Sequence, residues 1–83
     1  MIIKLKEFVE TGTTRHIQEV YLNTDDISCI RPSSRDNTAT KKELKLESQA
    51  VISEIYLRGN RIITAITAPG FFDDILKKQV LVG

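Results

Sequence analysis

One turn signal constrains the fold of this 83-residue chain more than any other feature. Gly59 and Asn60 separate two runs rich in β-branched residues, 50–57 and 61–67. Glycine and asparagine both accept the positive backbone φ angles that a tight hairpin turn requires. The sequence therefore predicts a β-hairpin here, and with it a core built from strands.

The composition agrees with a folded chain of this kind. Val, Ile and Thr, which favour strands, account for 24 of the 83 residues, and 41% of all residues are hydrophobic. A chain of this length supports only one hydrophobic core. We therefore expect a single domain over residues 1–83.

Three further strands are expected before the hairpin, at about 2–9, 15–22 and 27–30. They are separated by the turn-forming stretches 10–13 and 23–26, and Pro32 ends the third because proline cannot continue a ladder. The second run carries apolar residues on both faces, which predicts a strand covered on both sides in the centre of the sheet.

The C-terminal part of the chain has helical periodicity. Phe71, Phe72, Ile75 and Leu76 recur at spacings of three and four, and Pro69 stands where a helix can begin. The expected fold class is therefore α+β: an antiparallel β-meander of about five strands, which can curl into a small open barrel, with one C-terminal helix.

The stretch 32–43 interrupts this pattern with a single apolar side chain in twelve residues. Such a segment buries too little surface to offset its ordering entropy, so we expect a mobile polar loop. The run from Thr40 to Glu43 also fits a capping box. For residues 41–48 the sequence thus leaves a short helix and an extended segment as open alternatives.

Catalytic chemistry finds little support in the sequence. His16 and Cys29 are the candidate base and nucleophile, and no third group is placed to orient the imidazole. Adjacent carboxylates such as Asp25 and Asp26 diverge in strands and turns, and the four glycines are too scattered to cradle a phosphate. The prediction is a protein that is not an enzyme, with no catalytic residue, cofactor or metal ligand.

The cellular location follows from what the chain lacks. It has one cysteine, and no apolar run exceeds four residues, so a disulfide framework, a signal-peptide core and a membrane-spanning segment are not expected. The expectation is a cytoplasmic protein without a membrane partner.

Two classes of function remain, both based on binding. The first is a small non-enzymatic protein-interaction or self-assembling module, because so short a chain gains stability by burying strand edges or an apolar patch between subunits. A homo-oligomer or a protein partner is then expected. The candidate interface consists of four apolar residues of the expected helix: Phe71, Phe72, Ile75 and Leu76.

The second class is a nucleic-acid-binding regulatory protein. The formal net charge is only +1, but basic residues concentrate in 31–45 and at the predicted hairpin tip, where they can donate to phosphates. The candidate contacts are Arg31, Arg35, Lys41, Lys42, Arg58 and Arg61. We do not favour this alternative, because the strands offer no evident platform for stacking bases.

Two phrases of the sequence resemble small bacterial proteins of the FlbD type, which are linked to flagellar and swarming motility. The run 20–30 carries Val20, Asn23, Asp25 and Ile27 in the order that ends a strand in that family. The run 55–76 is similar to the family's hairpin, strand and terminal helix. The resemblance covers about residues 15–31 and 50–77, implies a bacterial source and a related fold, and transfers no catalytic residue.

Overall fold

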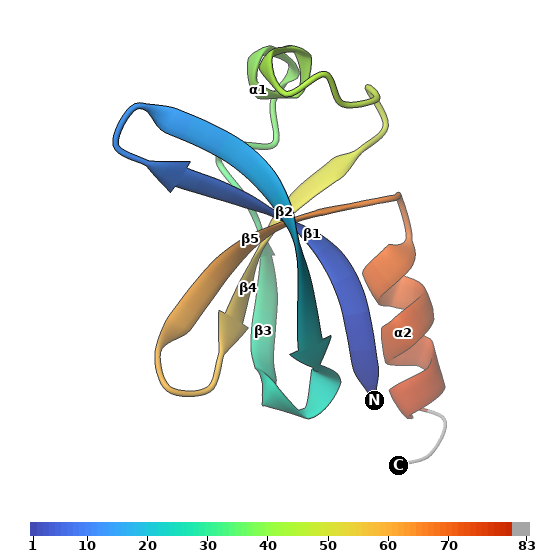
Figure 1. The fold of residues 1–83 in the computed structure, drawn as a ribbon. Coiled ribbons are helices and arrows are strands. Elements are labelled where there is room, and N and C mark those ends of the chain that lie inside the picture. Colours follow the sequence, from blue (N-terminus) through green and yellow to red (C-terminus); the bar gives the residue numbers. More distant parts are fainter. Residues whose placement is uncertain (81–83) are drawn as a thin grey trace.

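The computed structural model describes residues 1–80 and the side chains of residues 1–75. Two hairpins and a short connecting strand form the sheet, and two α-helices lie outside it (Figure 1). In chain order the elements are β1 (Ile2–Thr11), β2 (Thr14–Asn23), a 3-10 turn η1 (Thr24–Asp26), β3 (Ile27–Pro32), α1 (Thr38–Glu43), β4 (Val51–Leu57), β5 (Arg61–Thr67) and α2 (Phe71–Val80).

The five strands form one antiparallel sheet in the order β2-β1-β5-β4-β3. The five antiparallel strands are confirmed, but the predicted meander is not, because the consecutive strands β2 and β3 do not pair and β1 pairs with β5. The sheet is not a closed barrel, because β2 and β3 are its two edges and do not pair with each other. The predicted central position of the second strand is wrong: β1 pairs with β5 over Lys6, Glu7 and Phe8, and this long-range pairing leaves β2 at the edge.

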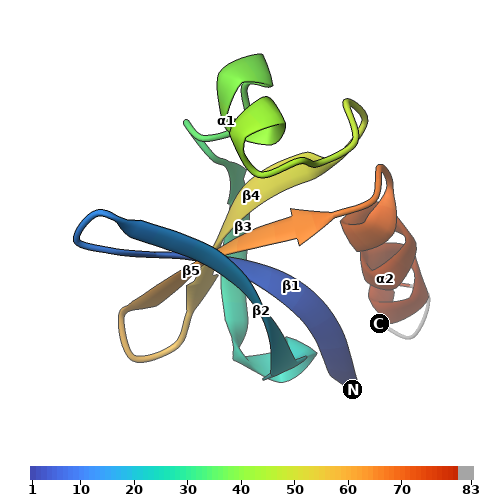
Figure 2. The same ribbon diagram turned by 45° about the horizontal axis from the view of Figure 1, so that its top comes forward.

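The β1–β2 hairpin reverses through a two-residue turn. Thr11 pairs with Thr14, and Gly12 adopts a φ of 60° as the first residue of the turn, as in a type II′ turn. Ten residue pairs follow without a register shift, from Thr11 and Thr14 to Ile2 and Asn23. The hairpin projects beyond the strands of the other half of the sheet in both ribbon views (Figures 1 and 2).

The predicted hairpin at Gly59 and Asn60 is confirmed. β4 and β5 pair from Val51 and Thr67 to Leu57 and Arg61, and the φ angles of Gly59 and Asn60 are 82° and 63°. Two residues in this left-handed region turn the chain within a three-residue connection. The local sequence determines this part of the fold.

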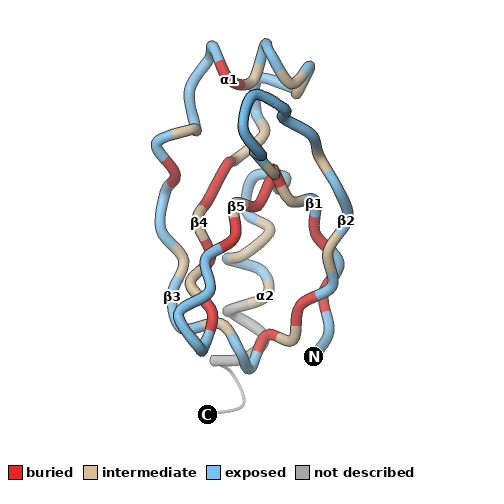
Figure 3. The backbone as a smooth tube through the Cα atoms, turned by 60° about the vertical axis from the view of Figure 1, so that its left-hand side comes forward, coloured by how far each residue is buried: buried red, intermediate tan, exposed pale blue. Residues whose placement is uncertain are grey.

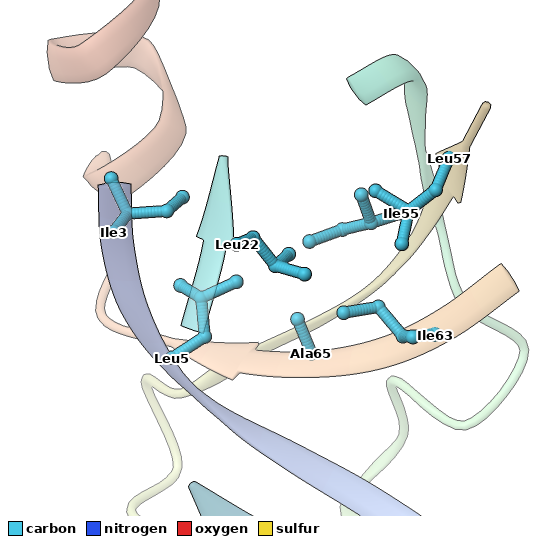
Figure 4. Close-up of a cluster of buried hydrophobic side chains, with 7 residues drawn as sticks. All are labelled: Ile3, Leu5, Leu22, Ile55, Leu57, Ile63 and Ala65. Carbon is cyan, nitrogen blue, oxygen red and sulfur yellow. The ribbon is translucent and has the colours of Figure 1, made fainter. Parts of the chain in front are cut away.

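The larger hydrophobic cluster lies on one face of the sheet, where side chains from both hairpins point toward one another (Figure 4). Ile55 and Ala65 are both fully buried. Burying a side chain of the size of Ile55 stabilises the fold by roughly 1.5–3 kcal/mol. The cluster consists of Ile3, Leu5, Leu22, Ile55, Leu57, Ile63 and Ala65.

A second cluster lies on the opposite face, because strand side chains alternate. It contains Phe8, Ile52 and Ile66, and Leu44 and Leu46 from the segment after α1 pack against it. The tube coloured by burial shows that most buried residues lie on the strands (Figure 3). The segment after α1 is therefore part of the packed structure.

The structure corrects the expectation for residues 32–43. A six-residue helix, α1, occupies 38–43, so residues 1–80 contain two α-helices where the sequence predicts one. Asn37 caps α1 by accepting a hydrogen bond of 2.8 Å from the amide of Thr40. The N-cap is therefore Asn37, three residues before the predicted Thr40. Of the two alternatives for 41–48, the short helix is correct for 41–43, and turns without regular structure follow.

The predicted C-terminal helix is confirmed as α2, which lies beside β1 (Figure 1). Gly70, with a φ of 78°, turns the chain after Pro69, and the amide of Asp74 donates to the carbonyl of Gly70 at 3.0 Å. Asp73 and Asp74 occupy the first turn, where the helix dipole favours negative charge.

Candidate interaction surface

The apolar residues proposed on α2 contact the protein's own core. Phe71 and Phe72 meet edge to face, with ring centroids 5.3 Å apart and ring planes at 84°. Both rings and Ile75 are half-buried and pack against the larger cluster. Leu76 lies outside the side chains that the structure describes. Covering the sheet therefore accounts for much of the apolar surface of α2.

The most exposed large hydrophobic side chains lie elsewhere, on the sheet and at the N-terminus. Ile2 is 63% exposed and Tyr21 65%. Ile2 pairs with Asn23 and Lys4 pairs with Tyr21, so Ile2 and Tyr21 are diagonal neighbours on one face of the β1–β2 hairpin. Among the side chains of residues 1–75, Met1 and Ile62 are the other two exposed residues of this kind. Ile2 and Tyr21 form what we call the β2 edge patch.

The candidate nucleic-acid contacts divide into two groups. Arg35 donates to Glu10 at 2.6 Å and lies over the ring of Phe8, and Lys41 contacts Asp36 at 3.0 Å. Arg31 lies over the ring of Tyr56 at 5.5 Å. These three cations are engaged within the protein.

Lys42, Arg58 and Arg61 are exposed and make no ion pair within the described part of the chain. Lys42 belongs to α1, whereas Arg58 and Arg61 flank the β4–β5 turn. α1 and this turn lie at opposite ends of the molecule in Figures 1 and 2. The fold thus separates basic residues that the sequence analysis groups together.

An ionic network joins the β1–β2 hairpin to the α1 segment. Glu10 accepts from Arg35 and from the Nε of Arg15 at 2.8 Å, and Arg15 also donates from Nη1 to Glu43 at 2.6 Å. All four side chains are partly solvated, so each pair contributes little alone. Together the contacts connect the polar stretch that the sequence presents as a loop to the edge of the sheet.

The two edges of the sheet differ in how they are protected. β3 has six residues, a register shift between Ile27 and Cys29, and Pro32 at its end. Bulges, proline and short length all discourage pairing with another chain. β2 has ten residues, no proline and no register shift. Only β2 is a long regular edge.

The register shows which backbone groups of β2 remain available. A two-residue turn makes Thr11 and Thr14 a hydrogen-bonded pair, and such pairs alternate along an antiparallel ladder. The amide of Thr24 donates to the carbonyl of Met1 at 2.9 Å, which fits the same alternation. The even-numbered residues of β2 therefore bond to β1. The N–H and C=O groups of Arg15, Ile17, Glu19 and Tyr21 point outward.

Several polar residues of β2 could have indicated an edge strand. Arg15, His16, Gln18 and Glu19 are all exposed. Ile17 and Val20 interrupt this run, and their presence on opposite faces produced the expectation of a central strand. The density of polar side chains around them is the signal that sequence reasoning missed.

The two candidate catalytic residues, His16 and Cys29, lie on different strands. His16 is on β2 and Cys29 on β3, the opposite edges of the sheet. Within residues 1–75, no group of three or more His, Cys, Asp or Glu side chains is arranged to hold a metal ion.

Two open clefts flank the start of α2. One, of about 560 Å³, has Lys4, Lys6 and Lys45 beside Glu19 and Glu47. The other, of about 370 Å³, has Arg31 beside Asp36 and Asp73. Each cleft mixes both signs of charge with apolar side chains, so neither selects a ligand of one charge.

Comparisons with known protein families, with curated proteins and with solved structures find no match for this chain. In the part of the chain that the structure describes, no helix is both long and apolar enough to cross a membrane.

Proposed function

We propose that this chain is a non-enzymatic protein-interaction module that binds a protein segment as an added strand along the outer edge of β2. The observation that carries the proposal is the contrast between the two sheet edges. β3 ends in Pro32 and is bulged, whereas β2 is regular over ten residues. Unpaired N–H and C=O groups on a regular edge are a template for another strand.

The β2 edge patch supplies side-chain contacts beside this backbone template. Ile2 and Tyr21 lie on one face of the hairpin, and the backbone groups of Tyr21 itself point outward. Tyrosine is enriched at protein interfaces because its ring buries apolar area while its hydroxyl stays hydrated. A partner strand with an apolar residue near Tyr21 would therefore bind better than a fully polar one.

The proposal assigns no catalysis to the chain. It retains the cytoplasmic location and the resemblance to FlbD-type motility proteins as predictions from the sequence. What supports an interaction role in place of an enzymatic one is the placement of His16 and Cys29 on opposite edges, where they cannot act as a base and nucleophile together.

A selection from displayed random peptides tests the proposal. We expect extended peptides that bind the wild-type protein and lose binding to Glu19→Pro, because proline removes one outward N–H group at an exposed position. Glu19→Ala is the matched control: it removes the same charge, keeps the amide and should retain binding. Peptides that bind wild type and Glu19→Pro equally would contradict an edge site.

Nucleic-acid binding is the second candidate function. Arg58 and Arg61 favour it, because both are exposed and make no ion pair within the described residues. Tyr56 is on the same hairpin, and Arg31 of the neighbouring strand β3 lies over its ring. A single-stranded oligonucleotide titration tests it, with Arg61→Glu as the variant and Lys42→Glu as the control at the other end. Affinity that falls steeply with salt and is lost in Arg61→Glu would support this function over the first.

A further inference from the structure

We infer that the strand added to β2 is β2 of a second copy of this chain, paired antiparallel about a two-fold axis at Ile17. This inference rests on the proposed function and names its partner. A two-fold axis perpendicular to the sheet keeps each face continuous, so odd-numbered residues of one copy lie opposite odd-numbered residues of the other. The possible centres are therefore single residues of β2.

Charge complementarity selects the register. With Ile17 opposite Ile17, Arg15 of each copy lies opposite Glu19 of the other, which forms two opposite-charge pairs by symmetry. Centring the pair on Gln18 places Glu19 opposite Ile17, and centring it on Glu19 places two carboxylates together. Directly opposed unlike charges stabilise an antiparallel pair and like charges destabilise it.

The backbone permits this register, but the charges select it, because a pair centred on Gln18 also places outward-pointing residues opposite one another. The N–H and C=O groups of Arg15, Ile17 and Glu19 point outward, so a pair centred on Ile17 forms about six interchain hydrogen bonds. Within the described part of the chain, no other strand occupies this edge. Pairing along this edge therefore gives protein hydrogen-bond partners to N–H and C=O groups of β2 that are hydrated in a single copy.

The side chains of Arg15 and Glu19 can serve two partners. Arg15 contacts Glu10 and Glu43 through Nε and Nη1, and a guanidinium has five N–H donors. Glu19 contacts Lys4 at 3.2 Å through one carboxylate oxygen, which leaves the other free to accept. The interchain pairs would extend the existing network without breaking it.

The overall charge permits association of identical copies. The formal net charge is only +1, so long-range repulsion between two chains is weak. Pairing over a short strand buries less than the roughly 1,000 Å² typical of a stable interface. We expect a reversible dimer that forms in the micromolar range or above.

Cysteine cross-linking tests the register directly. In a Cys29→Ser background, which removes the exposed native thiol, Ile17→Cys should form a disulfide-linked dimer under mild oxidation. Arg15→Cys and Glu19→Cys should cross-link only when the two variants are mixed. Cross-linking of Gln18→Cys in preference to Ile17→Cys would overturn the register.

Charge reversal tests the same pairing without touching Ile17. Arg15→Glu and Glu19→Arg each create two like-charge pairs, so each alone should dimerise about tenfold more weakly in sedimentation experiments. Mixing the two variants restores opposite charges at both positions, and the mixed dimer should match wild type. Two weakened variants that do not recover on mixing would overturn the inference.

Sedimentation of wild type separates this inference from the proposed function. A monomer at every concentration, together with edge-specific peptides from the selection, would overturn the second copy as partner and leave the binding module standing. A monomer with no edge-specific peptide would overturn both. Dimers that persist in Glu19→Pro but dissociate in Phe72→Asp would place the contact on α2 and overturn the inference.

Discussion

Adjacent residues of β5 differ sharply in what they contribute to stability. Ile63 is 5% exposed within the larger cluster, whereas its neighbour Ile62 is 56% exposed on the other face. We expect Ile63→Ala to lower the free energy of unfolding by about 2–5 kcal/mol, because it removes buried methyl groups and leaves a cavity. Ile62→Ala should change it by about 0.5 kcal/mol or less. Urea unfolding of both variants measures the contrast, and equal losses would contradict the burial pattern.

Gly59 gives a second prediction at the residue scale, this time for backbone conformation. Its φ is 82°, and no atom lies within 4 Å of a Cβ added there. Gly59→Val should therefore destabilise the fold through backbone strain alone, by roughly 1–2 kcal/mol. Gly59→Asn, which tolerates the left-handed region better, should lose clearly less. Equal urea midpoints for wild type and Gly59→Val would exclude the positive φ.

At the level of single elements, α1 depends on contacts outside itself. Six residues are too few for a helix to persist alone, and Asn37 caps its first turn. We expect Asn37→Ala to cost about 1 kcal/mol locally and to speed amide exchange in 38–43 while the global unfolding midpoint shifts little. Asn37→Asp, which keeps an accepting oxygen, should behave like wild type. Unchanged exchange in Asn37→Ala would show that the ionic network, and not the cap, orders α1.

The elements also show where sequence reasoning succeeds and where it stops. The β4–β5 hairpin was predictable because Gly59 and Asn60 encode its turn locally, and α2 because its apolar residues repeat at helical spacing. α1 was not, because Asn37 is one polar residue in a polar stretch and the packing of Leu44 and Leu46 is visible only in three dimensions. The edge of β2 was not predicted as a candidate site for a related reason. The polar side chains of β2 hint at an edge, but only the long-range pairing of β1 with β5 places β2 there.

At the scale of the whole molecule, the sheet consists of two halves with a narrow junction. The strand pairing between the β1–β2 hairpin and the β3–β4–β5 half is limited to Lys6, Glu7 and Phe8, which pair with β5. Beyond this junction β1 bends away, and α2 packs against the cluster between the halves. The missing pairing between β2 and β3 that keeps the sheet open is also what leaves the long edge of β2 unpaired. The absence of pairing between β2 and β3 therefore explains both the open sheet and the proposed binding surface.

Amide exchange along β2 provides a test at this scale. At low protein concentration, the amides of His16, Gln18 and Val20 should exchange at least about tenfold more slowly than those of Ile17 and Glu19, because only the even-numbered groups bond to β1. The amides in the middle of β4 and β5 should be slowest, since partners flank both strands.

Raising the protein concentration should then slow the exchange of only one set of β2 amides. If β2 pairs with a second copy about Ile17, the amides of Ile17 and Glu19 become protected, while that of Tyr21, beyond the paired segment, stays fast. Glu19→Pro should abolish this concentration dependence. Glu19→Ala removes the same charge but keeps the amide, so comparing the two variants isolates the effect of the lost N–H group. Protection of all β2 amides already at low concentration would mean that the edge is covered within one chain, and the open sheet itself would then need revision.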